Sequence, residues 1–220
     1  MKEDIIDMFT CKDGSKYAVL ATGAVKHVNP VPFTYDAEYS AVYDTPEYQR
    51  NSDILQAMRY SFATGAHGGP INSLLDCGYG NGAFMKFARQ YTRMVLGYDV
   101  TGVPVPEGCI STDDMNAGAQ VITFHDCLEH FHDINFVRDL NYTTLVVSLP
   151  NCPFSEMGKE WFENEYPHRK PSEHIWHFSA SSLAATMALL NWRQVARSYH
   201  ETIVRNRYPR NILSMAFKRP

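Results

Sequence analysis

Three alternating glycines, between an apolar run and an amphipathic segment, constrain the fold of this chain more than any other feature. Residues 73–77 are mostly apolar and predict a buried strand, and residues 83–91 carry apolar side chains at helical spacing. Between them, Gly78, Gly80 and Gly82 permit positive φ and let a ligand approach where a Cβ would clash. The following helix N-terminus directs unpaired N–H groups to the same place. The stretch therefore predicts a cofactor-binding loop.

The glycine pattern fits two classes of cofactor. Gly78, Gly80 and Ala83 satisfy the G-x-G-x-x-G/A fingerprint of dinucleotide-binding folds. Asp76 precedes the first glycine at the end of the strand, where a carboxylate would meet an ammonium group more naturally than a pyrophosphate. Asp99 ends a second apolar run about 20 residues further on, where either cofactor would place its ribose hydroxyls.

A third stretch, residues 121–130, favours the cationic cofactor. It reads as a strand followed by Asp126, Leu128, Glu129 and His130. A dinucleotide-binding enzyme has no evident use for this motif, so its presence separates the two interpretations.

Together these residues resemble class I S-adenosylmethionine-dependent methyltransferases, especially the group that acts on small molecules and carries an L-E-H sequence after the fourth strand. The resemblance covers residues 70–200. The matching motifs are D-x-G-x-G-x-G at Asp76–Gly82, the ribose acid at Asp99, L-E-H at residues 128–130, a strand at residues 146–151 and H-x-x-H-F-S-x-x-x-L at residues 174–183.

The resemblance implies both a fold and an activity. The fold is a doubly wound α/β structure, with a mostly parallel seven-stranded Rossmann-like sheet that ends in an antiparallel pair of strands. The implied cofactor is S-adenosylmethionine, and the partner is a small-molecule acceptor methylated at oxygen or nitrogen.

The resemblance also implies roles for particular residues. Those expected to bind the cofactor are Asp76, Gly78, Gly80, Gly82, Asp99, Asp126, and Asp113 or Asp114 beside the adenine. His130 is expected to face the acceptor as general base or positioning donor, with His125 as the reserve candidate, while Glu129 packs against the cofactor loop. A turn at residues 113–114 and a purely structural role for His130 are equally consistent with the sequence.

A metal site is not expected. His125, His130 and His132 lie within eight residues, but the spacing H-x-x-x-x-H-x-H matches none of the common zinc patterns. Five cysteines, an odd number without a C-x-x-C pair, also argue against a zinc ribbon and a disulfide framework.

We expect two parts in the chain, an N-terminal lid over residues 1–69 and the cofactor-binding domain over residues 70–220. Within the lid, residues 16–21 predict one strand of a hairpin, and Tyr39, Tyr43 and Tyr48 are candidate lining residues. A helix over residues 47–64 has an apolar stripe that we expect to dock on the sheet. The stripe consists of Ile54, Leu55, Met58 and Phe62, and it leaves Arg59 on another face.

The remaining elements follow from local patterns. Residues 109–112 and 144–149 predict strands, residues 128–140 a short helix, and residues 150–171 a long functional loop. Ser179 is a good N-cap for a helix, and the last two strands are expected at residues 192–199 and 211–218.

Composition excludes several classes of protein. The chain has 220 residues, enough for one domain with a small cap, and its formal net charge of −4 gives no general attraction to nucleic acid. No run of about 18 uncharged apolar residues occurs, and the charged N-terminus does not read as a signal segment, so we expect a soluble cytoplasmic protein without membrane partners. The oligomeric state is left open, a homo-oligomer included.

Two other functions fit part of the pattern. A nicotinamide-dependent oxidoreductase would use the same glycine loop and Asp99, but it leaves residues 126–130 unexplained. A non-catalytic regulator would keep the cofactor pocket without turnover. Binding of S-adenosylmethionine and of NAD separates the first two functions, and a methyl-transfer screen separates the third.

Overall fold

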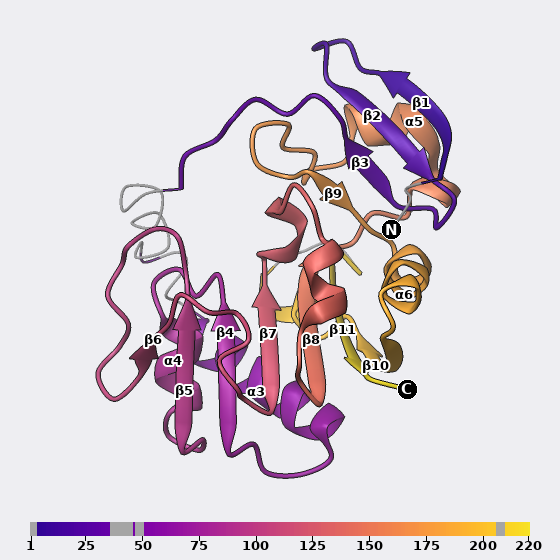
Figure 1. Cartoon of the computed structure of the whole chain (residues 1–220). Coiled ribbons are helices and arrows are strands. Elements are labelled where there is room, and N and C mark those ends of the chain that lie inside the picture. Colours follow the sequence, from indigo (N-terminus) through magenta and orange to yellow (C-terminus); the bar gives the residue numbers. More distant parts are fainter. Residues whose placement is uncertain (1–3, 36–45, 47–50, 206–209) are drawn as a thin grey trace.

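The structure, a computed structural model, describes residues 4–35, 46, 51–205 and 210–220. The larger of its two sheets has seven strands in the order β10-β11-β8-β7-β4-β5-β6 (Figure 1). The parallel strands are β4 (Ser73–Cys77), β5 (Met94–Tyr98), β6 (Ile110–Ser111), β7 (Val121–His125) and β8 (Thr144–Pro150), and the antiparallel pair is β10 (Arg193–Ser198) and β11 (Ile212–Lys218). The doubly wound, mostly parallel sheet with a final antiparallel pair is confirmed.

Helices α3 (Ser52–His67) and α4 (Ala83–Ala88) cover one face of this sheet, and α6 (Ala180–Leu189) covers the other. Helix α5 (Phe154–Asn164) packs on a second, smaller sheet. Other segments are the short helix α7 (Thr202–Arg205) and the 3₁₀ segments η2 (Leu128–His130) and η3 (Asn135–Asp139). Leu74 of β4 lies in one core with Ala63 of α3 and Phe84 of α4, whereas its neighbour Leu75 lies in another core with Leu183 of α6. Successive strand residues point to opposite faces, so both faces must be covered and β7 and β8 are buried along their whole length.

A second, smaller sheet lies toward the end of the large sheet to which the parallel strands point (Figure 1). Its antiparallel strands are β1 (Ile5–Thr10), β2 (Lys16–Leu20), β3 (Val25–His27) and β9 (Trp176–His177). The predicted hairpin strand at residues 16–21 is therefore confirmed as β2. Because Val25 and Lys26 pair with β9, the N-terminal strands are joined to the second half of the chain. The division into a lid and a cofactor domain at residue 69 stays a prediction.

Helix α3 is confirmed as a helix, but its predicted orientation is wrong. Ile54, expected against the sheet, is 55% exposed, whereas Arg59, expected on another face, is 8% exposed. Arg59 turns inward because two carboxylates, Asp126 and Glu201, lie on the sheet side of the helix and bind its guanidinium group. The apolar stripe around Ile54 consequently forms part of a shallow depression on the surface.

Two other predictions of secondary structure are wrong. The single helix expected at residues 128–140 is two 3₁₀ segments, because the Asp133 carboxylate accepts the Asn135 N–H at 2.8 Å and forms a turn between them. The expected loop at residues 150–171 contains α5, whose Phe162 is buried with Tyr17 and Val25 of the small sheet. Tertiary packing stabilises this helix despite the positive φ of Gly158 inside it.

Three local predictions hold. Helix α6 begins after Ser179, whose hydroxyl accepts the Ser182 N–H at 3.2 Å in a capping box. The predicted strands at residues 109–112 and 144–149 are β6 and β8, whereas α4 ends earlier than expected, at Ala88.

Tyr39, Tyr43 and Tyr48 lie outside the described residues. A search of the described residues finds no helix with the length and apolar character needed to cross a membrane.

Candidate functional site

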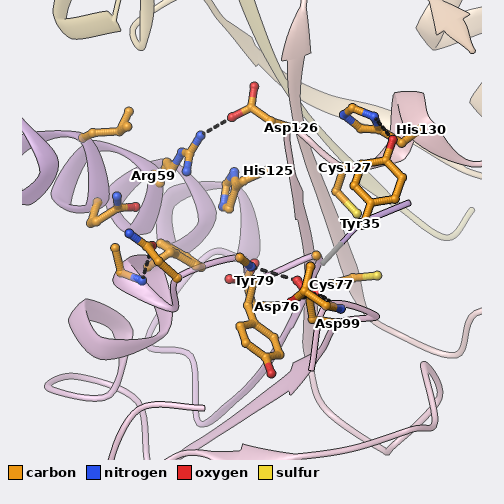
Figure 2. Close-up of a pocket in the computed structure, with 18 of the residues that line it drawn as sticks. Tyr35, Arg59, Asp76, Cys77, Tyr79, Asp99, His125, Asp126, Cys127 and His130 are labelled. Carbon is orange, nitrogen blue, oxygen red and sulfur yellow. Dashed lines mark hydrogen bonds and ion pairs between the residues drawn. The ribbon is translucent and has the colours of Figure 1, made fainter. Parts of the chain in front are cut away.

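A cavity of about 740 Å³ opens at the carboxyl ends of β4, β5 and β7, the edge where parallel sheets place their ligands. One wall is formed by the glycine loop after β4 and by Asp99 after β5. Tyr35, Arg59, His130 and Arg205 also line the cavity. Figure 2 shows Arg59 beside Asp126 on one side of the cavity, and Tyr35 beside His130 on another. The sheet thus brings together, in one cavity, most of the residues that the sequence motifs singled out.

The three glycines of the loop have different roles. A Cβ on Gly78 would lie 2.3 Å from Sγ of Cys127, and one on Gly82 would lie 2.6 Å from Cγ of Pro106. These two glycines are required because the backbone packs against its own neighbours. Only at Gly80, with φ of +55°, would a Cβ meet nothing within 4 Å. Since Gly80 lines the cavity, it is the glycine that leaves room for a ligand.

Asp76 is buried at the base of the cavity, with 2% of its surface exposed. The hydroxyl of Thr123 on the neighbouring strand donates a hydrogen bond to its Oδ1 at 2.7 Å. Burial raises the pKa of Asp76 to about 7, against the opposing effects of Thr123 and Arg59. A cationic group beside Asp76 would favour its charged form. Thr123 was not identified from the sequence, because only the pairing of β4 with β7 places it there.

Asp99 ties the glycine loop to the end of β5. Its Oδ2 accepts the N–H of Gly80 at 2.8 Å, while Oδ1 accepts the N–H and the hydroxyl of Thr101 at 2.8 and 2.7 Å. Each carboxylate oxygen can accept more than one hydrogen bond, so these contacts orient Asp99 and leave capacity for ribose hydroxyls. A Thr two residues after such an acid is the sequence signal for this local turn.

The structure does not bring Asp113 or Asp114 into the lining of the cavity. Both are exposed beyond the short strand β6, and Oδ1 of Asp114 accepts the N–H of Asn116 at 2.8 Å. This geometry is that of a turn, the alternative that the sequence had left open.

Asp126, expected to bind the cofactor, lines the cavity and is held in a network of charged side chains. Its carboxylate lies 2.9 Å from Nη2 of Arg59 and 2.8 Å from Nη1 of Arg205, and both arginines also bind Glu201, which is 0% exposed. Burial acts to raise the pKa of Asp126, but Arg205 and Arg59 outweigh it, so that pKa lies below its usual range. Asp126 has a φ of +53°, a conformation that this network holds in place.

Arg59, Glu201 and Arg205 were missed by the sequence analysis. Glu201 immediately precedes α7 and Arg205 is its last residue, and this spacing of four residues is the one signal that pointed to a pair. Arg59 comes from a distant helix, and nothing near it in the sequence indicates a partner.

His125 is buried beside this network and lines the cavity. Within the described part of the chain, neither of its ring nitrogens has a hydrogen-bond partner, and its ring lies edge-on to Phe84 with centroids 4.6 Å apart. Burial, followed by the positive charge of Arg59, lowers the pKa of His125 to about 3. The side chain is therefore neutral at physiological pH.

His130 faces the cavity from the other side of β7 (Figure 2). Its Nδ1 lies 2.7 Å from the hydroxyl of Tyr35 and 3.0 Å from the carbonyl oxygen of Glu173. Burial lowers the pKa of His130, with the Glu173 carbonyl opposing that effect. Tyr35 was not singled out in the sequence, because the contact joins the N-terminal segment to residues far along the chain.

Glu129 is 1% exposed, and neither of its carboxylate oxygens has a hydrogen-bond partner among the described residues. Burial, followed by the negative charge of Asp126, raises the pKa of Glu129 to about 8. The resemblance implies that this side chain packs against the cofactor loop, and this stays a prediction. One of its oxygens lies within 4.8 Å of ring nitrogens of His130 and His174.

Comparisons with known proteins find similarity in the fold alone. No protein-family model matches the sequence, and no curated protein matches it. Among solved structures, the chain is similar to the 1,6-didemethyltoxoflavin N1-methyltransferase of Burkholderia thailandensis, crystallised with 1,6-didemethyltoxoflavin and S-adenosylhomocysteine. The two share 15% identity over 89% of this chain and 95% of that one, with a TM-score of 0.58.

Two further structures with bound S-adenosylhomocysteine show the same fold. The N-methyltransferase NodS of Bradyrhizobium japonicum has 13% identity over 82% of this chain and 91% of its own, with a TM-score of 0.51. Magnesium protoporphyrin IX methyltransferase of Synechocystis has 12% identity over 79% and 84%, with a TM-score of 0.50. The structural neighbours are class I S-adenosylmethionine-dependent methyltransferases, and S-adenosylmethionine is the cofactor of this fold.

Proposed function

We propose that this chain is an S-adenosylmethionine-dependent methyltransferase that modifies an oxygen or nitrogen atom of a small molecule. The observation that carries the proposal is the single cavity of about 740 Å³ that joins the open face of Gly80 and Asp99 to a polar wall containing His130. A cavity of this size lies within the range of roughly 300–1,000 Å³ for small-molecule sites, and its lining offers both a glycine loop for a cofactor and polar side chains for an acceptor. The small-molecule substrates named for the structural neighbours support the same class of acceptor.

The residues around the glycine loop fit the proposed cofactor. Gly80 leaves space for it, and Asp99 is oriented by Thr101 and by the loop itself to accept hydrogen bonds from ribose hydroxyls. Asp76 is a buried carboxyl group that an ammonium group would help to ionise. In this proposal Asp126 acts through Arg59 and Arg205 to shape the cavity, and contact with the cofactor is left to Asp76, Gly80 and Asp99.

Bound S-adenosylmethionine supplies a methyl group on a positively charged sulfonium, so the protein has chiefly to align a nucleophile and exclude water. Positioning of this kind contributes roughly 7–11 kcal/mol to lowering a barrier. His130 is the residue proposed to contact the acceptor, because it lines the cavity and its ring is held by Tyr35 and the Glu173 carbonyl. His125 is the reserve candidate.

Titration calorimetry with S-adenosylhomocysteine and with NAD tests the cofactor. Binding of S-adenosylhomocysteine at micromolar concentration, without binding of NAD, is expected. The reverse preference would favour a nicotinamide-dependent oxidoreductase. A screen with radiolabelled methyl donor against small hydroxyl and amino compounds then tests turnover, and cofactor binding without transfer to any acceptor would favour a non-catalytic regulator. A cytoplasmic location and the absence of a nucleic-acid partner are part of the same proposal.

A further inference from the structure

Three side chains with metal-binding atoms converge beside the cavity. Glu129 and His130 are adjacent in η2, and His174 lies just before β9. One oxygen or nitrogen atom of each lies within 4.8 Å of one from each of the other two. Zinc binds such atoms at about 2.0–2.2 Å in a tetrahedral arrangement, so two of its ligand atoms are about 3.4 Å apart. Movements of less than about 1 Å per side chain would bring all three into coordination.

The carboxylate of Glu129 is buried in this cluster without a hydrogen-bond partner among the described residues. Glu129 is 1% exposed. Buried carboxyl groups are almost always paired, hydrogen-bonded or bound to a metal, because removing them from water is otherwise costly. The orphaned oxygens lie beside two imidazole rings, and an ion bound between them would supply the missing partner.

Both histidines are held in the orientation that metal ligands require. Nδ1 of His174 donates to the carbonyl oxygen of His168 at 2.8 Å, and Nδ1 of His130 lies 3.0 Å from the carbonyl oxygen of Glu173. A carbonyl oxygen only accepts, so a proton on Nδ1 of each ring satisfies these contacts and leaves the lone pair of Nε2 available to an ion. The hydroxyl of Tyr35, 2.7 Å from Nδ1 of His130, can accept the same proton. A backbone carbonyl bound to the second nitrogen is a frequent companion of metal-ligating histidines.

Hydrogen bonds connect the two segments that carry these ligands, η2 and the residues around β9. The N–H of Ile175 donates to the carbonyl oxygen of Glu129 at 2.9 Å, and Nε1 of Trp176 donates to the carbonyl oxygen of Phe131 at 2.8 Å. Both bonds lie within two residues of the proposed ligands. The three ligands are thus placed by the backbone rather than by flexible side chains alone.

We propose that Glu129, His130 and His174 bind a divalent transition-metal ion of the zinc class. Two imidazoles and one carboxylate are a common protein contribution to catalytic zinc sites, which keep a further coordination position open. His130 lines the cavity, so the open position faces the space where the acceptor is proposed to lie. The trio differs from the one considered in the sequence analysis, because only His130 is shared and His132 is exposed.

A metal ion bound here would favour acceptors that carry a hydroxyl group. This consequence rests on the proposed methyltransferase function. An ion of this class binds hydroxyl groups and lowers their pKa, so an acceptor hydroxyl bound to it would release its proton to solvent water without a side-chain base. The oxygen would then form its bond to the methyl carbon as the carbon–sulfur bond of the sulfonium breaks, which leaves S-adenosylhomocysteine. The site therefore favours methylation at oxygen, with His130 acting as a ligand rather than as the proton acceptor.

Binding of Co²⁺ to the full chain tests the site without any methyl transfer. After treatment with EDTA and its removal, the protein is titrated with Co²⁺ and followed by visible absorption and calorimetry. We expect one ion per chain and the intense bands of a four- or five-coordinate cobalt site. Zn²⁺ should displace Co²⁺ and abolish the bands. Glu129→Gln and His174→Gln should each weaken Co²⁺ binding about 100-fold or more.

His132→Gln is the matched control, because it removes a nearby exposed histidine and should leave Co²⁺ affinity within threefold of the parent. Each variant is also titrated with S-adenosylhomocysteine and melted, so that a folding defect is recognised. A folded parent protein that binds neither Co²⁺ nor Zn²⁺ at millimolar concentration would overturn the metal site, as would unchanged affinity in both ligand variants. Failure of S-adenosylhomocysteine to bind would instead count against the proposed function and leave the Co²⁺ result standing.

Discussion

Nη2 of Arg59 lies 2.9 Å from Oδ2 of Asp126 and thereby joins helix α3 to the residue after strand β7 (Figure 2). Arg59 also lies 3.0 Å from the fully buried carboxylate of Glu201. Replacement by Met keeps much of the side-chain volume but leaves these carboxylates short of one cation. Removing one partner of a buried ion pair costs about 3–5 kcal/mol, so Arg59→Met should lower the free energy of unfolding by about that amount.

Urea unfolding measures this effect, with Arg93→Met as the control. Arg93 is exposed, and its replacement should change stability by no more than about 0.5 kcal/mol. If both variants unfold at the same urea concentration as the parent, the network around Asp126 does not stabilise the fold.

The glycines of the loop should respond differently to substitution. Gly80→Val should leave a folded protein that no longer binds S-adenosylhomocysteine, because the new side chain extends into the cavity. Gly78→Ala should lower the melting temperature instead, because its Cβ would meet Cys127 at 2.3 Å. Calorimetry and thermal unfolding of both variants separate the two effects. A folded Gly80→Val protein with near-native affinity would show that the cofactor binds elsewhere.

Asp99 should contribute to affinity for the cofactor through charge-assisted hydrogen bonds, each worth roughly 1.5–3 kcal/mol. Asp99→Ala should therefore weaken S-adenosylhomocysteine binding by tens-fold or more, and Asp99→Asn by less. Thr101→Val removes one hydroxyl donor to Asp99 but keeps the backbone donor, so it should change affinity by only a fewfold. Equal affinities of the parent and the two Asp99 variants would place the ribose acid at another residue.

Cofactor affinity should depend on pH through Asp76. Burial raises its pKa to about 7, opposed by Thr123 and Arg59 and reinforced by Asp99, so the group is mostly protonated at pH 6 and mostly ionised at pH 8. An ammonium ligand favours the ionised form, so affinity for S-adenosylhomocysteine should fall about tenfold from pH 8 to pH 6. Because the folded pKa is raised, Asp76 contributes stability below pH 4 that is lost as the pH rises through 7.

Titrations at pH 6, 7 and 8 measure this linkage, with Asp76→Asn as the variant that should flatten it. The same variant should lose less stability than the parent between pH 5 and pH 8. A slope that persists in Asp76→Asn would assign the proton to another group.

His130 should be needed for turnover and not for cofactor binding. Loss of a residue that positions or activates the acceptor lowers turnover by about 10²- to 10⁴-fold, so His130→Gln should do so while S-adenosylhomocysteine affinity stays within threefold. His125→Gln is the comparison at the other side of β7. Once an acceptor is known, turnover measured from pH 5.5 to 9 decides whether His130 takes part in the reaction. Turnover within threefold of the parent at every pH would remove His130 from the mechanism.

The sequence by itself determined those features that are local. The strand at residues 73–77, the turn through Gly78, Gly80 and Gly82, and the cap at Ser179 each depend on residues close together in the chain, and each was predicted correctly. The order of the motifs also indicated the parallel sheet, because alternating strands and helices have few ways to pack.

The tertiary structure decided which side chains meet. Arg59 faces inward because it forms ion pairs with carboxylates from distant segments, and these ion pairs outweigh the tendency of the apolar stripe to face the sheet. The periodicity of α3 carries no information about those partners. The same applies to Glu129 and His174, which are brought together by backbone bonds between η2 and the segment before β9. Buried charges depend on neighbours in space, so their partners could not be predicted from spacing along the chain, whereas strands, turns and caps could.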